Sequence, residues 1–149
     1  MTLLALDSRT HGKELAATYT LYATLEPCPL CFSALYMSDV RKLVFAAADR
    51  YGGSTNLLGA TPYLSRKPIE ISGPLPSLGA VSIFLNVYSD LLRGIDVPHV
   101  VHQEFAIDHP ETVQTAYELA ATDSLGIRQH REFAGVYEKI QDTLARRSP

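Results

Sequence analysis

The sequence Thr24-Leu25-Glu26-Pro27-Cys28-Pro29-Leu30-Cys31 joins an aromatic- and threonine-rich run, residues 19–25, to a mostly apolar run, residues 30–37. The first run is typical of a β-strand and the second of an α-helix, so the two cysteines lie where a strand meets a helix. Two thiolates three positions apart on the first turn of a helix point the same way. The helix N-terminus favours the thiolate form, and together the two sulfurs can bind one zinc ion. This stretch therefore predicts a metal site that contains Cys28 and Cys31.

The residues that follow this junction predict an α/β fold. Residues 43–47 form a continuous apolar run that is typical of a strand covered on both faces. Strand, helix and strand in this order make a right-handed crossover between parallel strands. Alternating apolar and polar residues predict a third strand over 68–72, and apolar residues at helical spacing predict a helix over 77–92. We therefore expect a sheet flanked by helices.

The core is predicted to span residues 1–94, and it opens with an apolar helical run over 2–6 that lacks a capping box. Residues 95–149 are predicted to be a mostly helical extension packed on the same domain. Its first part, residues 95–109, is loop-like. Two helices are predicted after it, over 110–122 and 128–147.

The composition is that of an ordinary globular protein. The chain has 149 residues, 46% of them hydrophobic and 19% charged, and a formal net charge of −3. This length fits one domain, and the mild acidity argues against a broad nucleic-acid-binding surface. No apolar stretch approaches the roughly 18 residues of a membrane span, and no signal-peptide pattern precedes one. The sequence therefore predicts a cytoplasmic protein with no membrane contact.

The cysteine pair admits three interpretations: a zinc site, a redox pair or two structural cysteines. Two cysteines this close together cannot form a disulfide framework, which needs more cysteines at wider spacing. A thioredoxin-type redox pair also lies where a strand meets a helix, but nothing upstream supplies the strand and helix that lead into such a motif. Two structural cysteines are the third possibility. The flanking Glu26-Pro27 favours zinc.

The wider string, from Thr24 through Glu26-Pro27-Cys28 to Cys31, resembles the second half of the zinc signature of the cytidine and deoxycytidylate deaminase superfamily. That superfamily includes tRNA adenosine deaminases and guanine deaminases, and the resemblance extends over roughly residues 2–94. It implies a three-layer fold with a mixed sheet, and a Zn²⁺ ion held in part by Cys28 and Cys31. The first half of the signature, H-x-E, would supply the third ligand and the glutamate that transfers protons.

No H-x-E motif precedes the cysteines. Residues 2–6 resemble the interior of the helix that carries this motif in the family, so the missing His and Glu are expected just before Met1. We therefore expect an N-terminally incomplete, truncated deaminase with little turnover of its own, and we assign no catalytic residue within the chain.

Two substitutes for the missing half occur in the sequence. His11 and Glu14 have the wrong spacing, and they precede the strand over 19–25, which would carry the chain about 20 Å away from them. His102-Gln103-Glu104 has the H-x-E form, but its neighbours do not predict a long helix. We expect His102 and Glu104 to lie at the surface or at a partner contact, with a role at the site left open.

The resemblance implies a zinc-dependent hydrolase that deaminates a nucleobase, nucleoside or nucleotide at the C–N bond of a cyclic amidine. The alternative is a catalytically degenerate, zinc-binding subunit or scaffold. A small nucleobase or nucleoside is the expected partner, with tRNA left open, and a homodimer is expected. Glu26 is expected to be structural. Asp49 and Tyr51 are candidates for the border of the cleft, although Asp49 also suits a turn.

Overall fold

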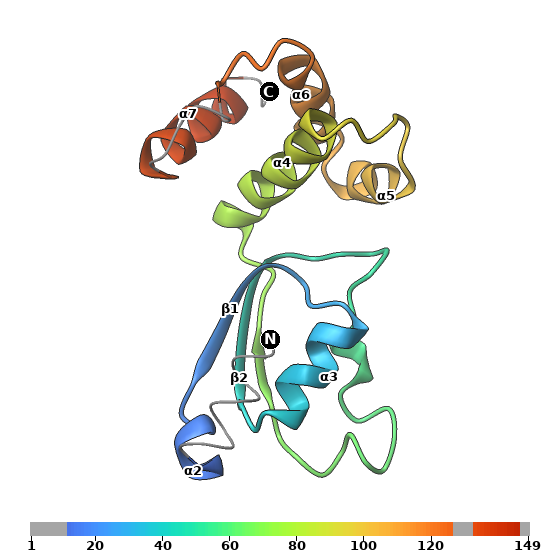
Figure 1. The fold of residues 1–149 in the computed structure, drawn as a ribbon, viewed down its shortest axis with the longest axis vertical. Coiled ribbons are helices and arrows are strands. Elements are labelled where there is room, and N and C mark those ends of the chain that lie inside the picture. Colours follow the sequence, from blue (N-terminus) through green and yellow to red (C-terminus); the bar gives the residue numbers. More distant parts are fainter. Residues whose placement is uncertain (1–11, 127–132, 147–149) are drawn as a thin grey trace. The chain divides into compact units, whose positions relative to one another are not determined.

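The computed structural model describes residues 12–126 and 133–146. The helix expected over 2–6 and the residues Met1 and His11 lie outside the described residues. Figure 1 shows the order of the elements along the chain. The first described element is a short helix that the sequence did not predict, α2 (Lys13–Ala16).

The predicted crossover is confirmed. Strand β1 (Thr20–Leu25) leads into helix α3 (Pro29–Met37), which leads into strand β2 (Lys42–Ala47). A 3₁₀ turn, η1 (Thr55–Leu57), and strand β3 (Glu70–Ser72) follow. The strand order is β1-β2-β3, and both pairs are parallel. The α/β class is thus confirmed, and within the described ranges the sheet is parallel where a mixed sheet was expected.

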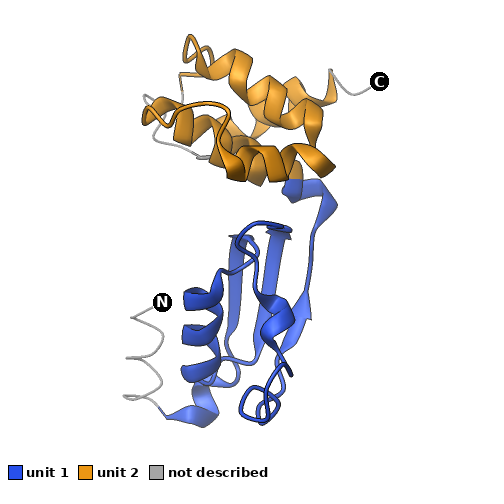
Figure 2. Cartoon of the chain, turned by 90° about the vertical axis from the view of Figure 1, so that its right-hand side faces the viewer, with its two compact units in different colours: residues 1–79 blue, residues 80–149 orange. Residues whose placement is uncertain are grey.

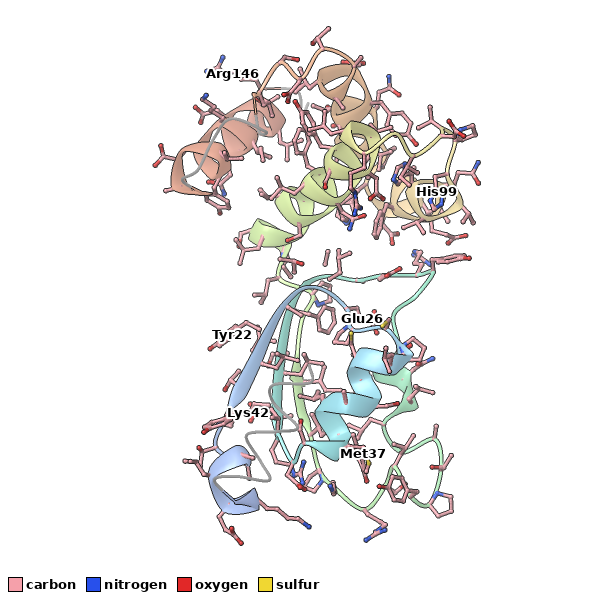
Figure 3. All side chains as sticks on the ribbon, in the orientation of Figure 1. Tyr22, Glu26, Met37, Lys42, His99 and Arg146 are labelled. Atoms are coloured by element: carbon pink, nitrogen blue, oxygen red, sulfur yellow. The ribbon has the colours of Figure 1, made fainter. Side chains whose placement is uncertain are left out.

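Helix α3 covers one face of this sheet. Alternate residues of a strand point to opposite faces, so Leu43 and Phe45 of β2 meet Phe32 and Leu35 of α3 in one buried cluster. The opposite face carries Tyr22 of β1, whose side chain is 75% exposed. This buried cluster holds α3 against the sheet, and Figure 3 shows Tyr22 on the side of the sheet away from α3.

The chain divides into two compact units, residues 1–79 and residues 80–149 (Figure 2). Unit 1 contains the sheet and α3. Unit 2 contains most of helix α4 (Pro76–Leu92) and the three helices after it. Those helices are α5 (Val100–Asp108), α6 (Pro110–Ala120) and α7 (Phe133–Ala145). The predicted boundary at residue 94 and the packing of residues 95–149 on one domain stay predictions.

One prediction about unit 2 is wrong. Residues 95–109 were expected to be loop-like, but most of them form α5. Its apolar positions have almost no helical periodicity, because the polar His102 takes a buried position beside Phe105. A pattern search for amphipathic helices cannot recognise such a segment. The predicted helices on either side are confirmed by α4 and α6.

None of the helices within the described ranges is long and apolar enough to cross a membrane.

Candidate metal centre

Cys28 and Cys31 flank the first turn of α3. Cys28 is the N-cap residue, with extended backbone angles, and Pro29 follows at the first helical position. Proline suits that position because its missing N–H has no helical acceptor there. Both cysteines are half-buried and neither forms a disulfide. The strand-to-helix junction therefore presents two free thiols at the N-terminus of a helix, as the sequence predicted.

The two thiols have different acidities. The backbone N–H of Cys31, and then its thiol, interact with the sulfur of Cys28 and hold the pKa of Cys28 below its ordinary value. Its thiol interaction with Cys28, followed by burial, raises the pKa of Cys31. Cys28 is thus the more readily ionised of the pair, and a thiolate is the form that binds metals.

Glu26 fixes the segment that carries the cysteines. Its Oε1 accepts hydrogen bonds from the backbone N–H and the hydroxyl of Thr55, at 3.1 and 2.5 Å, and its Oε2 accepts one from the backbone N–H of Asp49, at 3.3 Å. The backbone N–H of Ser54 also donates to the carbonyl of Pro27, at 3.0 Å. These contacts tie the loop after β2 to the cysteine turn, and Figure 3 labels Glu26 beside the start of α3. The structural role expected for Glu26 agrees with them.

Asp49 forms the turn at the start of this loop. Its Oδ1 accepts hydrogen bonds from the backbone N–H groups of Tyr51 and Gly52, at 3.0 and 2.8 Å. This is the turn geometry that Asp side chains favour. Tyr51 is 60% exposed.

The cysteine pair fits half of a zinc site. Thiolate sulfur is a preferred zinc ligand, and a catalytic zinc site has three protein ligands and one open position. Within residues 12–126 and 133–146, no group of three or more His, Cys, Asp or Glu side chains could hold a metal ion. The described residues thus supply two sulfur ligands for a zinc ion. No other side chain among them supplies a third ligand.

His102 is not a surface residue, contrary to the prediction. It is fully buried in unit 2, where its Nε2 lies 3.2 Å from Asp90 Oδ2 and its Nδ1 lies 3.3 Å from the hydroxyl of Tyr117. Both ring nitrogens of His102 thus have a hydrogen-bond partner. His102 is therefore a hydrogen-bonded core residue. Glu104 is half-buried on the same helix.

The other substitute is only partly described. Glu14 is exposed on α2, which precedes β1, and His11 lies outside the described residues. The contacts of Glu26 with the following loop could not be predicted from the sequence. They join Glu26 to Asp49 and to Thr55, which are separated from it by 23 and 29 positions.

Comparison with known proteins gives matches to short segments. The chain is 54% identical over 39 residues to a tRNA-specific adenosine deaminase of Bacillus subtilis, which covers 26% of this chain and 24% of that protein. It is 49% identical over 35 residues to a tRNA-specific adenosine deaminase of Haemophilus influenzae, covering 24% and 20%. A probable cytosine deaminase of Schizosaccharomyces pombe is 30% identical over 70 residues, covering 37% and 41%. No protein-family model and no solved structure matches the chain.

These matches, together with the α/β fold, support the cytidine deaminase-like superfamily over short segments of the chain. All three relatives are named as deaminases. The matched segments span less than half the length of each of them.

Proposed function

We propose that the protein is a zinc-dependent hydrolytic deaminase of a nucleobase, nucleoside or nucleotide. The observation that carries this proposal is the pair of free thiols at the start of α3, held by the Glu26 contacts to the following loop. Similarity to three proteins named as deaminases supports the same reaction class. The reaction is hydrolysis of an exocyclic amine to a carbonyl, with release of ammonia.

In this proposal Cys28 and Cys31 hold the zinc ion, and a third ligand comes from outside the described residues. Bound zinc lowers the pKa of a coordinated water to near 7. Glu26 positions the metal ligands and does not transfer protons, because both of its oxygens already accept hydrogen bonds from Asp49 and Thr55. A free base, nucleoside or nucleotide is the proposed substrate, and a cytoplasmic homodimer is the proposed form.

Metal analysis of the chain, purified under reducing conditions, tests the zinc site. We expect about one zinc ion per chain, and almost none in the double variant Cys28→Ser/Cys31→Ser. Ser33→Ala is the matched control, since Ser33 is exposed on the same helix. A zinc content that is the same with and without the thiols contradicts the assignment.

Ammonia release from cytosine, adenosine and guanine tests the reaction. Release that depends on both cysteines supports a deaminase. Zinc binding without release from any of these compounds, in protein that also contains an H-x-E segment before the cysteines, favours the zinc-binding subunit or scaffold instead. A reversible disulfide between Cys28 and Cys31, in protein that binds no zinc, would identify a redox pair.

A further inference from the structure

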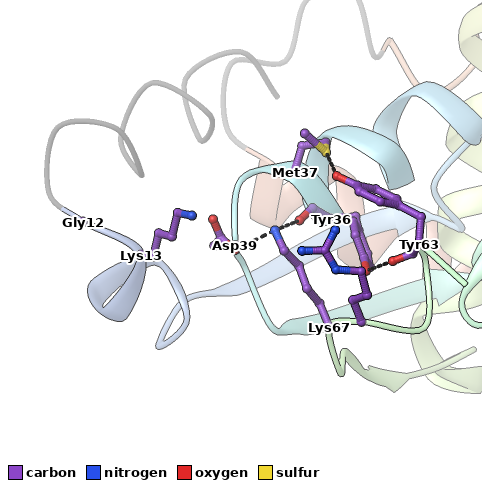
Figure 4. A pocket seen from close by; sticks show the side chains of 8 residues that line it. Gly12, Lys13, Tyr36, Met37, Asp39, Tyr63 and Lys67 are labelled. Atoms are coloured by element: carbon purple, nitrogen blue, oxygen red, sulfur yellow. Dashed lines mark hydrogen bonds and ion pairs between the residues drawn. The ribbon is translucent and has the colours of Figure 1, made fainter.

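A hollow in unit 1 lies around the C-terminal end of α3, whereas the cysteines lie at the start of that helix (Figure 4). Its volume is about 500 Å³, within the range of small-molecule sites. Six of its side chains carry the chemistry: the cations Lys13, Arg66 and Lys67, the acid Asp39, and the aromatic residues Tyr36 and Tyr63. The hollow is thus lined by three cations against one carboxylate.

The single acid of the hollow is already neutralised. Asp39 Oδ1 lies 2.6 Å from Arg41 Nη2 and 2.7 Å from Lys67 Nζ, and Lys67 also donates to the carbonyl of Tyr36 at 3.2 Å. By contrast, Lys13 and Arg66 form no ion pair with any residue of the described ranges. Two cations at the wall of the hollow therefore have their charge available for a ligand.

The aromatic wall is held in place by hydrogen bonds. The hydroxyl of Tyr36 donates to the carbonyl of Tyr63 at 2.5 Å, and the hydroxyl of Tyr63 donates to the sulfur of Met37 at 2.9 Å. The two tyrosine rings lie 5.6 Å apart, and the Arg66 guanidinium lies 5.4 Å from the Tyr63 ring. Tyr63 is nevertheless 46% exposed, so aromatic surface stays accessible at the wall of the hollow that Lys13 and Arg66 also line.

We propose that this hollow binds a phosphate group, with Lys13 and Arg66 as its main contacts. Guanidinium and ammonium groups form short, charge-assisted hydrogen bonds to phosphate oxygens, and a guanidinium can form two at once. The exposed ring of Tyr63 can stack with a base attached to that phosphate. The proposal goes beyond the deaminase reaction and does not depend on it, since none of these residues belongs to the cysteine turn.

Titration of the full chain with inorganic phosphate, followed by ¹H–¹⁵N NMR at constant ionic strength, tests the site. We expect saturable shifts at residues 12–13 and 66–67. The variant Lys13→Ala/Arg66→Ala should lose affinity at least about ten-fold, which corresponds to one charge-assisted hydrogen bond. Both residues are exposed, so the substitution leaves the core intact.

The control Lys139→Ala/Arg146→Ala removes two exposed positive charges from α7 and the residue after it, and it should keep the wild-type affinity. If both double variants lose the same affinity for phosphate, net charge explains the loss and the proposal is overturned. Shifts that do not saturate would overturn it as well.

Titrations with AMP and adenosine then separate the two sources of phosphate. Tighter binding of AMP than of phosphate, lost in Tyr63→Leu, assigns the hollow to a nucleotide. Equal binding of AMP and phosphate assigns it to the free anion, and tighter binding of adenosine than of either overturns the proposal. The variant Cys28→Ser/Cys31→Ser should keep phosphate binding, so failure of the deaminase proposal and failure of this one are distinguishable.

Discussion

The Glu26 carboxylate shows how one residue can organise the candidate site. It follows β1 directly, and its oxygens accept hydrogen bonds from Asp49 and Thr55, two points on the loop after β2. Removing a half-buried carboxylate that accepts several hydrogen bonds lowers the free energy of unfolding, because its donors are then left without a partner. The position of the loop beside the cysteine turn therefore depends on this side chain.

We expect Glu26→Ala to lower the free energy of unfolding by about 2–3 kcal/mol, because the N–H groups of Asp49 and Thr55 lose their acceptor. Urea-induced unfolding at neutral pH measures this change. Glu70→Ala is the control, since Glu70 is exposed and its side chain, among the described residues, forms only a 3.9 Å ion pair with Lys42. That variant should stay within about 0.5 kcal/mol of wild type. Similar losses in the two variants would contradict the role of Glu26.

Gly53 leaves no room for a side chain beside Glu26. A Cβ atom at this position would lie 2.4 Å from the carbonyl oxygen of Asp49 and 2.4 Å from Glu26 Oε2. We expect Gly53→Ala to displace the loop and destabilise the protein by about 1–3 kcal/mol, the usual cost of overpacking. Thermal unfolding measures the loss, and a variant as stable as wild type would refute the close approach.

At the scale of elements, α5 is held in unit 2 by a polar residue. His102 is fully buried between Asp90 of α4 and Tyr117 of α6, so it joins three helices by hydrogen bonds. A surface residue or a metal ligand would behave differently when replaced.

We expect His102→Ala to cost about 2–4 kcal/mol, through a cavity and two lost hydrogen bonds, without any change in zinc content. Gln103→Ala, at the exposed neighbouring position of α5, should be nearly neutral. Urea unfolding and metal analysis of the same samples test both parts. Loss of zinc from a folded His102→Ala protein would contradict this prediction and would identify His102 as a zinc ligand.

Helix α7 contains a glycine that nothing in its surroundings requires. A Cβ atom on Gly135 would meet no heavy atom of a described residue within 4 Å. Alanine restricts the unfolded chain more than glycine does, so Gly135→Ala should stabilise the helix by up to about 1 kcal/mol. A higher midpoint of thermal unfolding would agree with this, and a lower midpoint would contradict it.

At the scale of the whole molecule, stability at low pH depends on Asp39. This residue takes a left-handed conformation just after α3, with φ of 61°, and it is buried. Burial raises the pKa of its carboxyl group, but hydrogen bonds and charges from Lys67 and Arg41 outweigh burial and hold the pKa below the ordinary value of 3.8. A carboxyl group with a lower pKa in the folded state stabilises the fold where it is ionised.

Because the pKa of Asp39 is lowered in the folded state, the fold loses stability as the pH falls. The contribution of Asp39 is fully present well above pH 3.8, and it is lost as the pH falls through that value toward the lower pKa of the folded state. Asp39→Asn should cost about 1–2 kcal/mol at neutral pH and should flatten the acid limb of the profile. Asparagine tolerates the left-handed conformation. Urea unfolding between neutral pH and the acid range tests this, with the exposed Asp96→Asn as control; equally steep acid limbs in wild type and Asp39→Asn would contradict it.

The elements near the cysteines could be predicted because their signals are local. The aromatic and threonine-rich run became β1, the apolar run became α3, and the apolar segment after it became the parallel strand β2. Helix α5 could not be predicted, since its buried face contains His102, whose burial depends on Asp90 and Tyr117.

The sequence by itself determined the strand-to-helix junction and its two cysteines, because periodicity, proline placement and ligand spacing act between residues a few positions apart. Only the tertiary structure decided what surrounds them. It brought Thr55 to Glu26 across 29 positions, buried His102 and placed Lys13, Arg66 and Tyr63 around one hollow. The physical reason is that the cost of burying a polar or charged group depends on which partners the fold brings to it, and those partners are distant in sequence.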